Sequence, residues 1–196
     1  MSSTTVDRTF FARDPDVVAR DLVGVVVRRG PVALRLVEVE AYAQHDTACH
    51  AHKGRTPRTA PLFGPPGHAY VYLCYGIHRM LNLVCGVDGT AAGVLLRAAE
   101  VVEGVDVVTA RRGLPPGPSI CSGPGKIGVA LAMDLLDTGK DLFGGDFLTL
   151  ERGRSRRVIS GPRVGIDYAS PLDRRRKWRF ADADSKAVSH RRLFNT

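Results

Sequence analysis

Strand-like runs joined by short turns dominate the middle of this 196-residue chain. Connections that short can join only antiparallel neighbours, because parallel strands need a crossover of a dozen or more residues. Helical patterns occur on both sides of these runs. The sequence therefore predicts an α+β domain, with a curved, mainly antiparallel sheet and surrounding helices. The expected strands cover 25–27, 33–42, 68–75, 80–86 and 93–99, with shorter ones at 147–151 and 164–166.

Three helices and one long loop are expected beside these strands. Asp14 followed by proline is typical of an N-cap, and a helix from there should end near Gly24. Two further helical patterns cover 101–111 and 126–136. Residues 43–68 are predicted to form a loop, and a loop of that length in a compact domain is usually functional or disordered.

A single domain accounts for residues 1–196, with residues 1–7 expected to form a flexible tail, because no repeat or long linker divides the chain. No apolar run is long enough to cross a membrane and no signal peptide is apparent, so we expect an intracellular, cytoplasmic protein. The four cysteines are scattered without a CxxC pair. This spacing favours free thiols over disulfides, and we expect no metal site.

Positive charge is concentrated towards the C-terminus. Residues 1–150 hold 15 basic and 15 acidic side chains, whereas residues 151–196 hold 13 basic and 5 acidic ones, so the net charge of +8 lies in the last stretch. Arginine-rich clusters at 152–157 and 174–177 carry most of it. Such clusters attract a polyanion by releasing condensed counterions. They are as typical of a solvated surface, so they nominate nucleic acid without establishing it.

The run over 34–42 alternates apolar and polar side chains, and in a strand the two kinds would point to opposite faces. One face carries Val37, Val39 and Ala41, and the other carries Glu38, Glu40 and Tyr42. Two carboxylates on one face are most often solvated surface. The alternative is an active-site face, on which one carboxylate acts as a general base.

Tyrosines are unusually dense in the run over 69–75. Tyr70 and Tyr72 would share one face of a strand, and Tyr75 lies at its end before Gly76. Tyrosines are common in strands simply because they form sheets well. Beside a carboxylate, however, aromatic rings form a pocket suited to a flat, electron-poor base. The two segments together indicate a site, although neither decides the matter by itself.

Further motifs extend this pattern in order along nearly the whole chain. They are Glu38-Val-Glu-Ala-Tyr42 with His50 and Gly54-Arg-Thr-Pro-Arg58, Pro66-Gly-His-Ala-Tyr-Val-Tyr-Leu-Cys-Tyr-Gly76 with Asn82, Val94-Leu-Leu-Arg-Ala98, Cys121-Ser-Gly-Pro-Gly-Lys126, and Arg163-Val-Gly-Ile166 before Trp178-Arg-Phe180. This spaced combination resembles the alkyladenine (3-methyladenine) DNA glycosylase family, including its mammalian members.

The resemblance implies a role for each matching residue. Glu40 would activate the attacking water, and Arg97 would lie beside that carboxylate and water. The flipped base would be held in a pocket of Tyr42, His50, Tyr72 and Asn82, in which Asn82 tests the 2-position of the purine. Without the resemblance, a lone loop histidine such as His50 is more often an ordinary surface or packing residue.

The same resemblance implies how DNA would be held. Tyr75 would wedge into the duplex and fill the gap left by the flipped nucleotide, although a tyrosine before glycine is otherwise most often packing at a sheet end. The expected DNA contacts are Arg55, Thr56, Arg58 and Lys126. Lys126 follows a helix-start pattern, so it would contact a phosphate or cap that helix.

As a function, the resemblance implies a base-excision repair glycosylase that hydrolyses alkylated or deaminated purines from damaged double-stranded DNA by base flipping. It would be a monofunctional hydrolase without AP lyase activity, need no cofactor, act as a monomer and, in a bacterium, associate with the nucleoid. One alternative is a catalytically silent damaged-DNA-binding protein. A more remote one is an RNA-binding module that stacks bases on its tyrosines.

Overall fold

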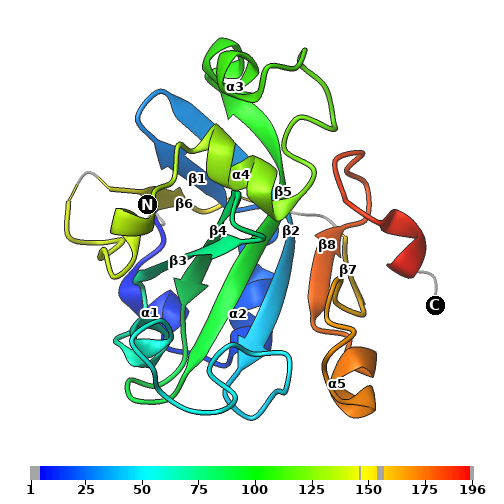
Figure 1. Ribbon diagram of the computed structural model, residues 1–196. Coiled ribbons are helices and arrows are strands. Elements are labelled where there is room, and N and C mark those ends of the chain that lie inside the picture. The colour runs from blue at the N-terminus through cyan, green and yellow to red at the C-terminus, as the bar shows by residue number, and fades with distance from the viewer. Residues whose placement is uncertain (1–4, 146, 154–156, 195–196) are drawn as a thin grey trace.

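The structure is a computed structural model that describes residues 5–145, 147–153 and 157–194. Within these residues, eight strands form one open sheet in which every paired neighbour is antiparallel, and helices surround it (Figure 1). The α+β prediction is confirmed.

The strands are β1 Val26–Arg29, β2 Val32–Ala43, β3 Ala69–Cys74, β4 His78–Val84, β5 Ala92–Glu103, β6 Thr149–Glu151, β7 Val158–Gly161 and β8 Arg179–Asp182. The helices are α1 Arg8–Phe11, α2 Pro15–Leu22, α3 Val105–Arg112, α4 Pro124–Ala130 and α5 Pro171–Arg175, with short 3-10 helices η1 Ala60–Phe63, η2 Leu135–Asp137 and η3 Arg191–Phe194.

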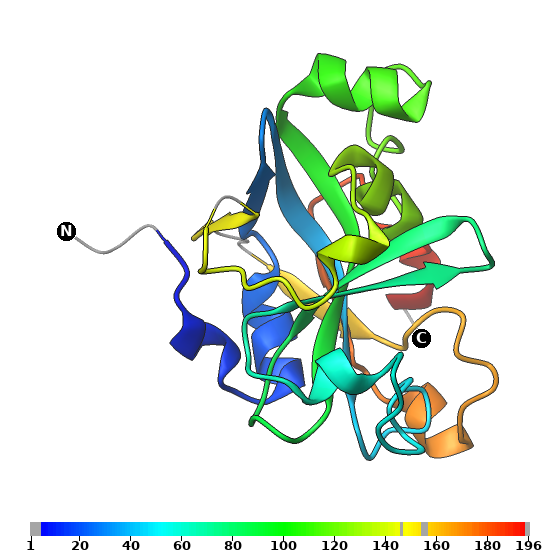
Figure 2. The same ribbon diagram turned by 60° about the vertical axis from the view of Figure 1, so that its left-hand side comes forward.

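The long strands β2 and β5 form the centre of the sheet. One edge of β2 pairs with β5, and its other edge pairs first with β1 and then, at Glu38–Glu40, with β8. The sheet therefore divides along β2 and carries β7 and β8 off its main path. Helices α2 and α4 pack against the central strands and contribute to one apolar core. In Figure 2 the β3–β4 hairpin projects from this body beside the segment that leads to α5.

Three irregularities interrupt the pairing of β2 with β5, one between Ala33 and Leu34 and two bulges on either side of Glu38. Val37 is skipped in the register on β2, and Arg97 is skipped on β5. Each extra residue shifts the alternation of side chains by one position. Leu36 and Val39 consequently both point into the main core, while Glu38, two residues after Leu36, does not.

The bulge makes one part of the predicted face assignment wrong. Val39 and Ala41 do share the main core, but Val37 packs with Ala98 and Ala181 in a separate cluster beneath the C-terminal segment. Strict alternation from the sequence could not anticipate this, because it assumes an uninterrupted ladder.

The helix predicted over 101–111 starts before the observed helix α3, which begins at Val105. The first residues of the predicted helix continue β5, because Val101 and Glu103 still pair with the beginning of β2. Gly104, with φ of 72°, ends the strand, and α3 follows from Val105. A left-handed conformation of this kind suits glycine, which lacks a Cβ.

The predicted helix over 126–136 is too long. It corresponds to α4, which ends at Ala130, followed by a separate turn of 3-10 helix, η2. Ala132 adopts a positive φ of 49°, which no continuous right-handed helix allows. Asp134 then caps η2 through its side chain.

The predicted strand over 164–166 is wrong. The Val164 amide donates to the carboxylate of Glu40 instead of to a neighbouring strand. The strands of this region are β7 and β8, which were not predicted, and α1 and α5 were also missed. Within the predicted tail, residues 1–4 lie outside the described residues, whereas Val6 is buried and Asp7 caps α1.

The cysteines do not form disulfides: all four are free, in agreement with the expectation. Within the part of the chain that the structure describes, no helix is long and apolar enough to cross a bilayer. The same residues contain no group of three or more His, Cys, Asp or Glu side chains arranged to hold a metal ion.

Candidate active site

Glu40 is a fully buried carboxylate on β2. Its Oε1 accepts a hydrogen bond from the Val164 amide at 2.8 Å. Its Oε2 accepts one from the Tyr42 hydroxyl at 2.8 Å and one from the Arg97 guanidinium at 3.2 Å. Glu38 is fully buried as well, so the interpretation of this face as solvated surface is wrong.

Arg97 lies between the two carboxylates. Its Nε donates to Glu38 at 3.0 Å, its Nη1 donates to Glu40 at 3.2 Å, and its Nη2 lies 3.5 Å from the Ser189 hydroxyl. Arg179, also fully buried, lies 3.3 Å from Glu38, so two cations balance two anions in the interior. Burial disfavours the charged guanidinium of Arg97, but the negative charges of Glu40 and Glu38 outweigh it and raise the pKa of Arg97. Arg97 therefore stays protonated between the two carboxylates.

Tyr42 connects this ionic cluster to the outside. Burial and the adjacent negative charge of Glu40 raise the pKa of Tyr42 well above its ordinary value, so the phenol stays protonated as a donor to Glu40. The Arg163 guanidinium lies 4.7 Å from the centre of the Tyr42 ring and is itself paired with buried Asp46 at 2.9 Å. This pair fixes one side of the tyrosine. The Arg163–Asp46 pair was not predicted, although Arg163 begins one of the sequence motifs.

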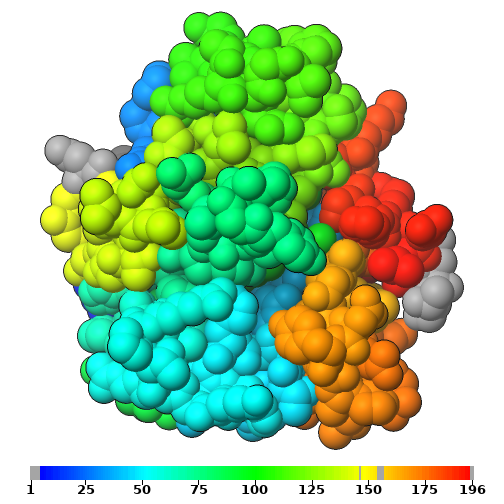
Figure 3. All heavy atoms as spheres, in the orientation of Figure 1, coloured from blue at the N-terminus to red at the C-terminus, as the bar shows by residue number. Residues whose placement is uncertain are grey.

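A pocket opens beside Tyr42, where β2, β3, β4 and the 43–63 segment meet. Figure 3 shows the surface hollowed between the 43–63 segment, in cyan, the β3–β4 hairpin, in teal, and the segment before α5, in orange. The structure brings together in it all four residues predicted for the base pocket. The pocket is lined by Tyr42, Ala48, Cys49, His50, Leu62, Tyr70, Tyr72, Asn82 and Gly93.

His50 is in contact with the tyrosines although much of its surface is exposed. Its Nδ1 shares a hydrogen bond of 3.1 Å with the Tyr70 hydroxyl, and its ring lies 4.5 Å from the Tyr72 ring in an edge-to-face arrangement. Partial burial of the ring, followed by the positive charge of Arg58, lowers the pKa of His50 to about 4. The imidazole is therefore neutral at pH 7.

The pocket also depends on residues of the β3–β4 pair. Asn82 is buried and pairs with Tyr70 across the two strands, and its Nδ2 donates to the Tyr70 carbonyl at 3.1 Å. Tyr70 was recognised in the sequence only as sharing a face with Tyr72. Its position as the partner of both His50 and Asn82 required the folded hairpin and loop.

Tyr75 lies at the tip of the β3–β4 hairpin and is 89% exposed. The interpretation of this tyrosine as sheet-end packing is therefore wrong. Its φ of 51° places it in the left-handed region, which non-glycine residues rarely adopt, and Gly76 follows with φ of 72°. Ile77, next along the turn, is 69% exposed, so the hairpin ends in two unpacked apolar side chains.

The predicted DNA contacts are found in two different places. Arg55, Thr56 and Arg58 are exposed on the loop beside the pocket, and the Arg58 guanidinium lies 5.6 Å from the centre of the Tyr72 ring. The Thr56 hydroxyl is engaged locally with Thr59. Lys126, in α4, donates to the carbonyl of Ser119 at 3.0 Å, so it tethers the preceding loop and does not cap the helix.

The arginine-rich clusters differ in what the structure describes. Residues 154–156 of the first cluster lie outside the described residues. In the second, Arg174 and Arg175 are exposed in the last turn of α5. Arg176 pairs with Asp173 at 2.9 Å and lies 4.8 Å from the Trp178 ring.

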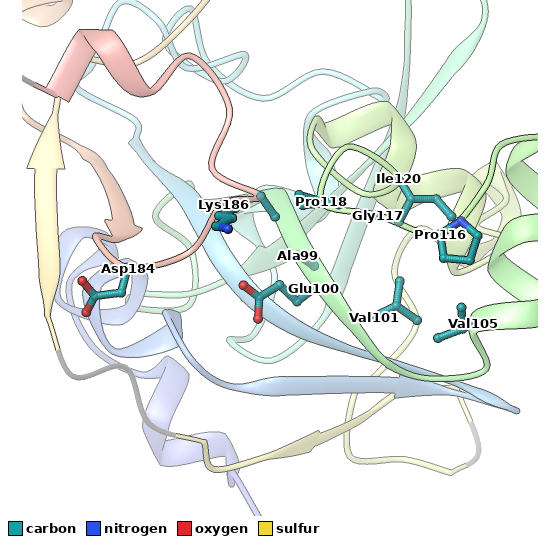
Figure 4. A pocket seen from close by; sticks show the side chains of 11 residues that line it. Ala99, Glu100, Val101, Val105, Pro116, Gly117, Pro118, Ile120, Asp184 and Lys186 are labelled. Carbon is teal, nitrogen blue, oxygen red and sulfur yellow. The ribbon is translucent and has the colours of Figure 1, made fainter.

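A larger cavity of about 400 Å³ lies away from these residues, between β5, the loop before α4 and the C-terminal segment (Figure 4). None of the predicted site residues lines it. Two of its three charged side chains already have partners, because Glu100 pairs with Arg35 and Asp184 pairs with Arg157. Without a convergent catalytic group, this cavity does not qualify as the active site.

The chain is similar to known proteins over most of its length. The model of the methylpurine-DNA glycosylase family matches residues 9–186. A protein of Arabidopsis thaliana named "DNA-3-methyladenine glycosylase" is 47% identical over 183 residues, which cover 92% of this chain and 72% of the relative. Proteins named "Putative 3-methyladenine DNA glycosylase" from Nitrosococcus oceani and Methanocella arvoryzae are 48% and 44% identical, covering 93% and 94% of this chain and 92% and 95% of the relatives.

An antiparallel sheet with a buried carboxylate beside an aromatic pocket, together with these matches, defines a DNA glycosylase. The chain belongs to the methylpurine-DNA glycosylase family. It is a base-excision repair enzyme of the 3-methyladenine type, and its substrate is DNA. The alternative of a catalytically silent damage-binding protein is not favoured.

Proposed function

We propose that this glycosylase flips an alkylated or deaminated purine nucleotide out of duplex DNA and hydrolyses its N-glycosidic bond with a water activated by Glu40. The observation that carries the proposal is the burial of Glu40 with Tyr42 as its hydrogen-bond partner, because Tyr42 also lines the aromatic pocket. A carboxylate next to a pocket for a flat ring has the position that a general base for this reaction needs.

Flipping is required because the target base cannot be reached inside the duplex, and it costs a few kcal/mol. Tyr75 suits the part of a wedge that occupies the vacated stack, since it is 89% exposed at the end of a projecting hairpin. The flipped base then enters the pocket of Tyr42, His50, Tyr72 and Asn82. A purine methylated at N3 or N7 is a cation, which aromatic faces bind with about 0.5–2 kcal/mol per contact. A neutral His50 does not repel it.

In the chemical step, Glu40 takes a proton from water as the water oxygen attacks C1′ of the sugar. The C1′–N bond breaks, and its electron pair leaves with the base, which neutralises a methylated purine. Such a base is already a good leaving group, so little acid catalysis is needed. Glu40 also stabilises positive charge that develops on the sugar, as carboxylates do in glycoside hydrolysis. Arg97 orients Glu40 for both tasks through its hydrogen bond to Oε2.

We propose further that the enzyme is monofunctional. Strand cleavage by a lyase step needs an amine that forms a Schiff base with the sugar. The residues that line the pocket in the described part of the chain include no lysine. The reaction as written needs no cofactor and no second subunit. We propose that the enzyme acts as a monomer on damaged duplex DNA in the cytoplasm, and on the nucleoid in a bacterium.

The test is single-turnover base release from duplex oligonucleotides that carry one hypoxanthine, ethenoadenine or N-methylpurine. We expect release by the natural chain and a loss of about 10²–10⁴-fold in Glu40→Gln, with lesion binding retained. Strand breaks should appear only after alkali. Glu100→Gln, which alters a carboxylate with no contact to the site, is the matched control.

Turnover retained in Glu40→Gln would remove Glu40 from the role of general base. Strand breaks without alkali would contradict a monofunctional enzyme. A parallel titration with undamaged single-stranded RNA addresses the remaining alternative, because an RNA-binding module would prefer it to the lesion duplex.

A further inference from the structure

Glu38 is a second buried carboxylate that the proposed reaction does not use. It accepts hydrogen bonds from Arg97 at 3.0 Å and Arg179 at 3.3 Å, and from both the amide and the hydroxyl of Ser189, at 2.6 and 2.9 Å. It is fully buried, and it does not line the aromatic pocket. A charge so placed needs a reason, because removing it from water is costly unless other groups compensate.

Arg97 is the group that joins Glu38 to the catalytic carboxylate. Its Nε is held by Glu38 and its Nη1 by Glu40, so one planar guanidinium spans both anions. Arg97 is also skipped in the register of β5 with β2, so its side chain is oriented by these contacts. An arginine side chain has many rotamers, and two fixed points on the guanidinium select one of them.

Ser189 belongs to the C-terminal segment that follows β8. This segment is packed down by Ala187 and Val188, which contact Val37 and Ala98 near the bulge. Ser185, earlier in the segment, is bound separately to Glu100 at 2.5 Å. The chain end therefore reaches Glu38 and Arg97 through Ser189, while the His190 carbonyl and the Phe194 ring contact Arg179. Figure 4 shows that the preceding part of the segment lines the larger cavity instead.

We propose that Glu38 and Ser189 form a clamp that positions Arg97 against Glu40. The proposal rests on the assignment of Glu40 as general base. Ser189 fixes both oxygens of Glu38, Glu38 fixes the Nε of Arg97, and Arg97 thereby presents its Nη1 to Oε2 of Glu40. Glu38 and Ser189 are positioning residues, because neither touches the pocket.

Loss of the clamp should slow chemistry and leave binding intact. A displacement of about 1 Å in a catalytic group costs roughly 100-fold in rate. We therefore expect Glu38→Gln to lower the single-turnover rate constant roughly 10- to 100-fold. Ser189→Ala removes one of the four hydrogen bonds to Glu38 and the 3.5 Å contact of the hydroxyl with Arg97, and we expect a loss of roughly 3- to 10-fold. The dissociation constant for lesion duplex should change by less than about threefold, and Ser189→Thr, which keeps the hydroxyl and the amide, should restore most of the rate.

Two control variants separate positioning from general damage to the fold. Ser185→Ala removes a buried hydroxyl from the same segment, and Asp182→Asn alters a buried carboxylate that pairs with Arg35 on the neighbouring strand. Neither residue contacts Arg97. Thermal unfolding of each variant shows whether it is folded. If Glu38→Gln does not fold, the clamp is tested by comparing the rate of Ser189→Ala with that of Ser185→Ala.

A rate in Ser189→Ala equal to that of Ser185→Ala would overturn the clamp, as would a loss that appears in binding and not in rate. The outcome for Glu40→Gln is read separately. If that variant is inactive while Glu38→Gln and Ser189→Ala are fully active, only the clamp fails. If Glu40→Gln retains turnover, the proposed function itself fails.

Discussion

Burial determines the protonation states of the groups around the pocket. Tyr42 and Tyr72 are held as neutral phenols, since loss of water raises the pKa of each well above its ordinary value. His50 is shifted in the opposite sense, because burial disfavours its charged form. The wall that faces the base is therefore uncharged, while the charges of Glu40 and Arg97 lie behind Tyr42.

The shift at His50 is directly measurable. NMR titration of the imidazole should give a midpoint near 4, below the ordinary value of 6.5, and base release should show no inflection from His50 near pH 6.5. Because the folded state disfavours protonation, the contribution of His50 to stability is present above pH 6.5 and is lost as pH falls from there towards 4. A midpoint at 6.5 would contradict the neutral pocket. His52, exposed on the same loop, is the internal comparison.

Tyr75 holds a left-handed backbone conformation at the tip of the β3–β4 hairpin. A left-handed conformation costs a non-glycine residue roughly 1–2 kcal/mol. The chain retains that strained geometry at the most exposed tyrosine in its described part. Strain of this kind is common where function needs a fixed orientation, which agrees with the proposed wedge.

At the scale of elements, the hairpin is supported by α4. This helix approaches β4 so closely that a Cβ on Gly128 would lie 2.0 Å from the carbonyl oxygen of Arg79. A Cβ on Gly125 would meet the His78 ring at 2.9 Å. The glycines therefore allow the helix to rest on the backbone of the strand that leads from the hairpin tip.

Gly128→Ala should consequently destabilise the protein, although alanine is the better helix former. The added methyl meets backbone that cannot move aside, and overpacking of this kind costs about 1–3 kcal/mol in the free energy of unfolding. Gly125→Ala should cost less, because the exposed His78 side chain can shift. Urea unfolding of both variants, with Val129→Ala on the exposed side of α4 as control, tests the order. Equal stability of Gly128→Ala and the natural chain would disprove the close contact.

At the scale of the whole molecule, the site is built from segments distant in sequence. β2 supplies Glu40, the loop after it supplies His50, the hairpin supplies Tyr72, β5 supplies Arg97, and the segment before α5 supplies the Val164 amide. The excess positive charge belongs to the last 46 residues, which include the arginines of α5. In Figure 3 the orange region that includes α5 lies beside the hollow.

Arg174 and Arg175 are therefore expected to contact DNA phosphates. Each phosphate contact contributes about 0.9 to the slope of log affinity against log salt concentration, so Arg174→Ala and Arg175→Ala should each reduce that slope by about one. Fluorescence anisotropy with lesion duplex at several salt concentrations measures it. Arg20→Ala, exposed on α2, is the control. An unchanged slope would return these arginines to the solvated surface.

The sequence by itself determined the local elements and the chemistry-bearing residues. Alternation and turn spacing predicted most strands of the central sheet, and the motifs nominated Glu40, Tyr42, His50, Tyr72 and Asn82, which the fold brings together. These signals can be read from the sequence because each depends on residues only a few positions apart. Boundaries were less accurate where a strand continued into an expected helix, as at 101–103, since pairing with β2 outweighed local preference.

Only the tertiary structure decided which carboxylates are buried and what holds them. The bulges at Val37 and Arg97 depend on the register between two strands, which neither strand encodes alone. The Val164 amide lies 124 positions from Glu40, and Ser189 lies 151 positions from Glu38. Such contacts are fixed by the packing of the entire chain, because a buried charge must find its donors wherever the fold brings them.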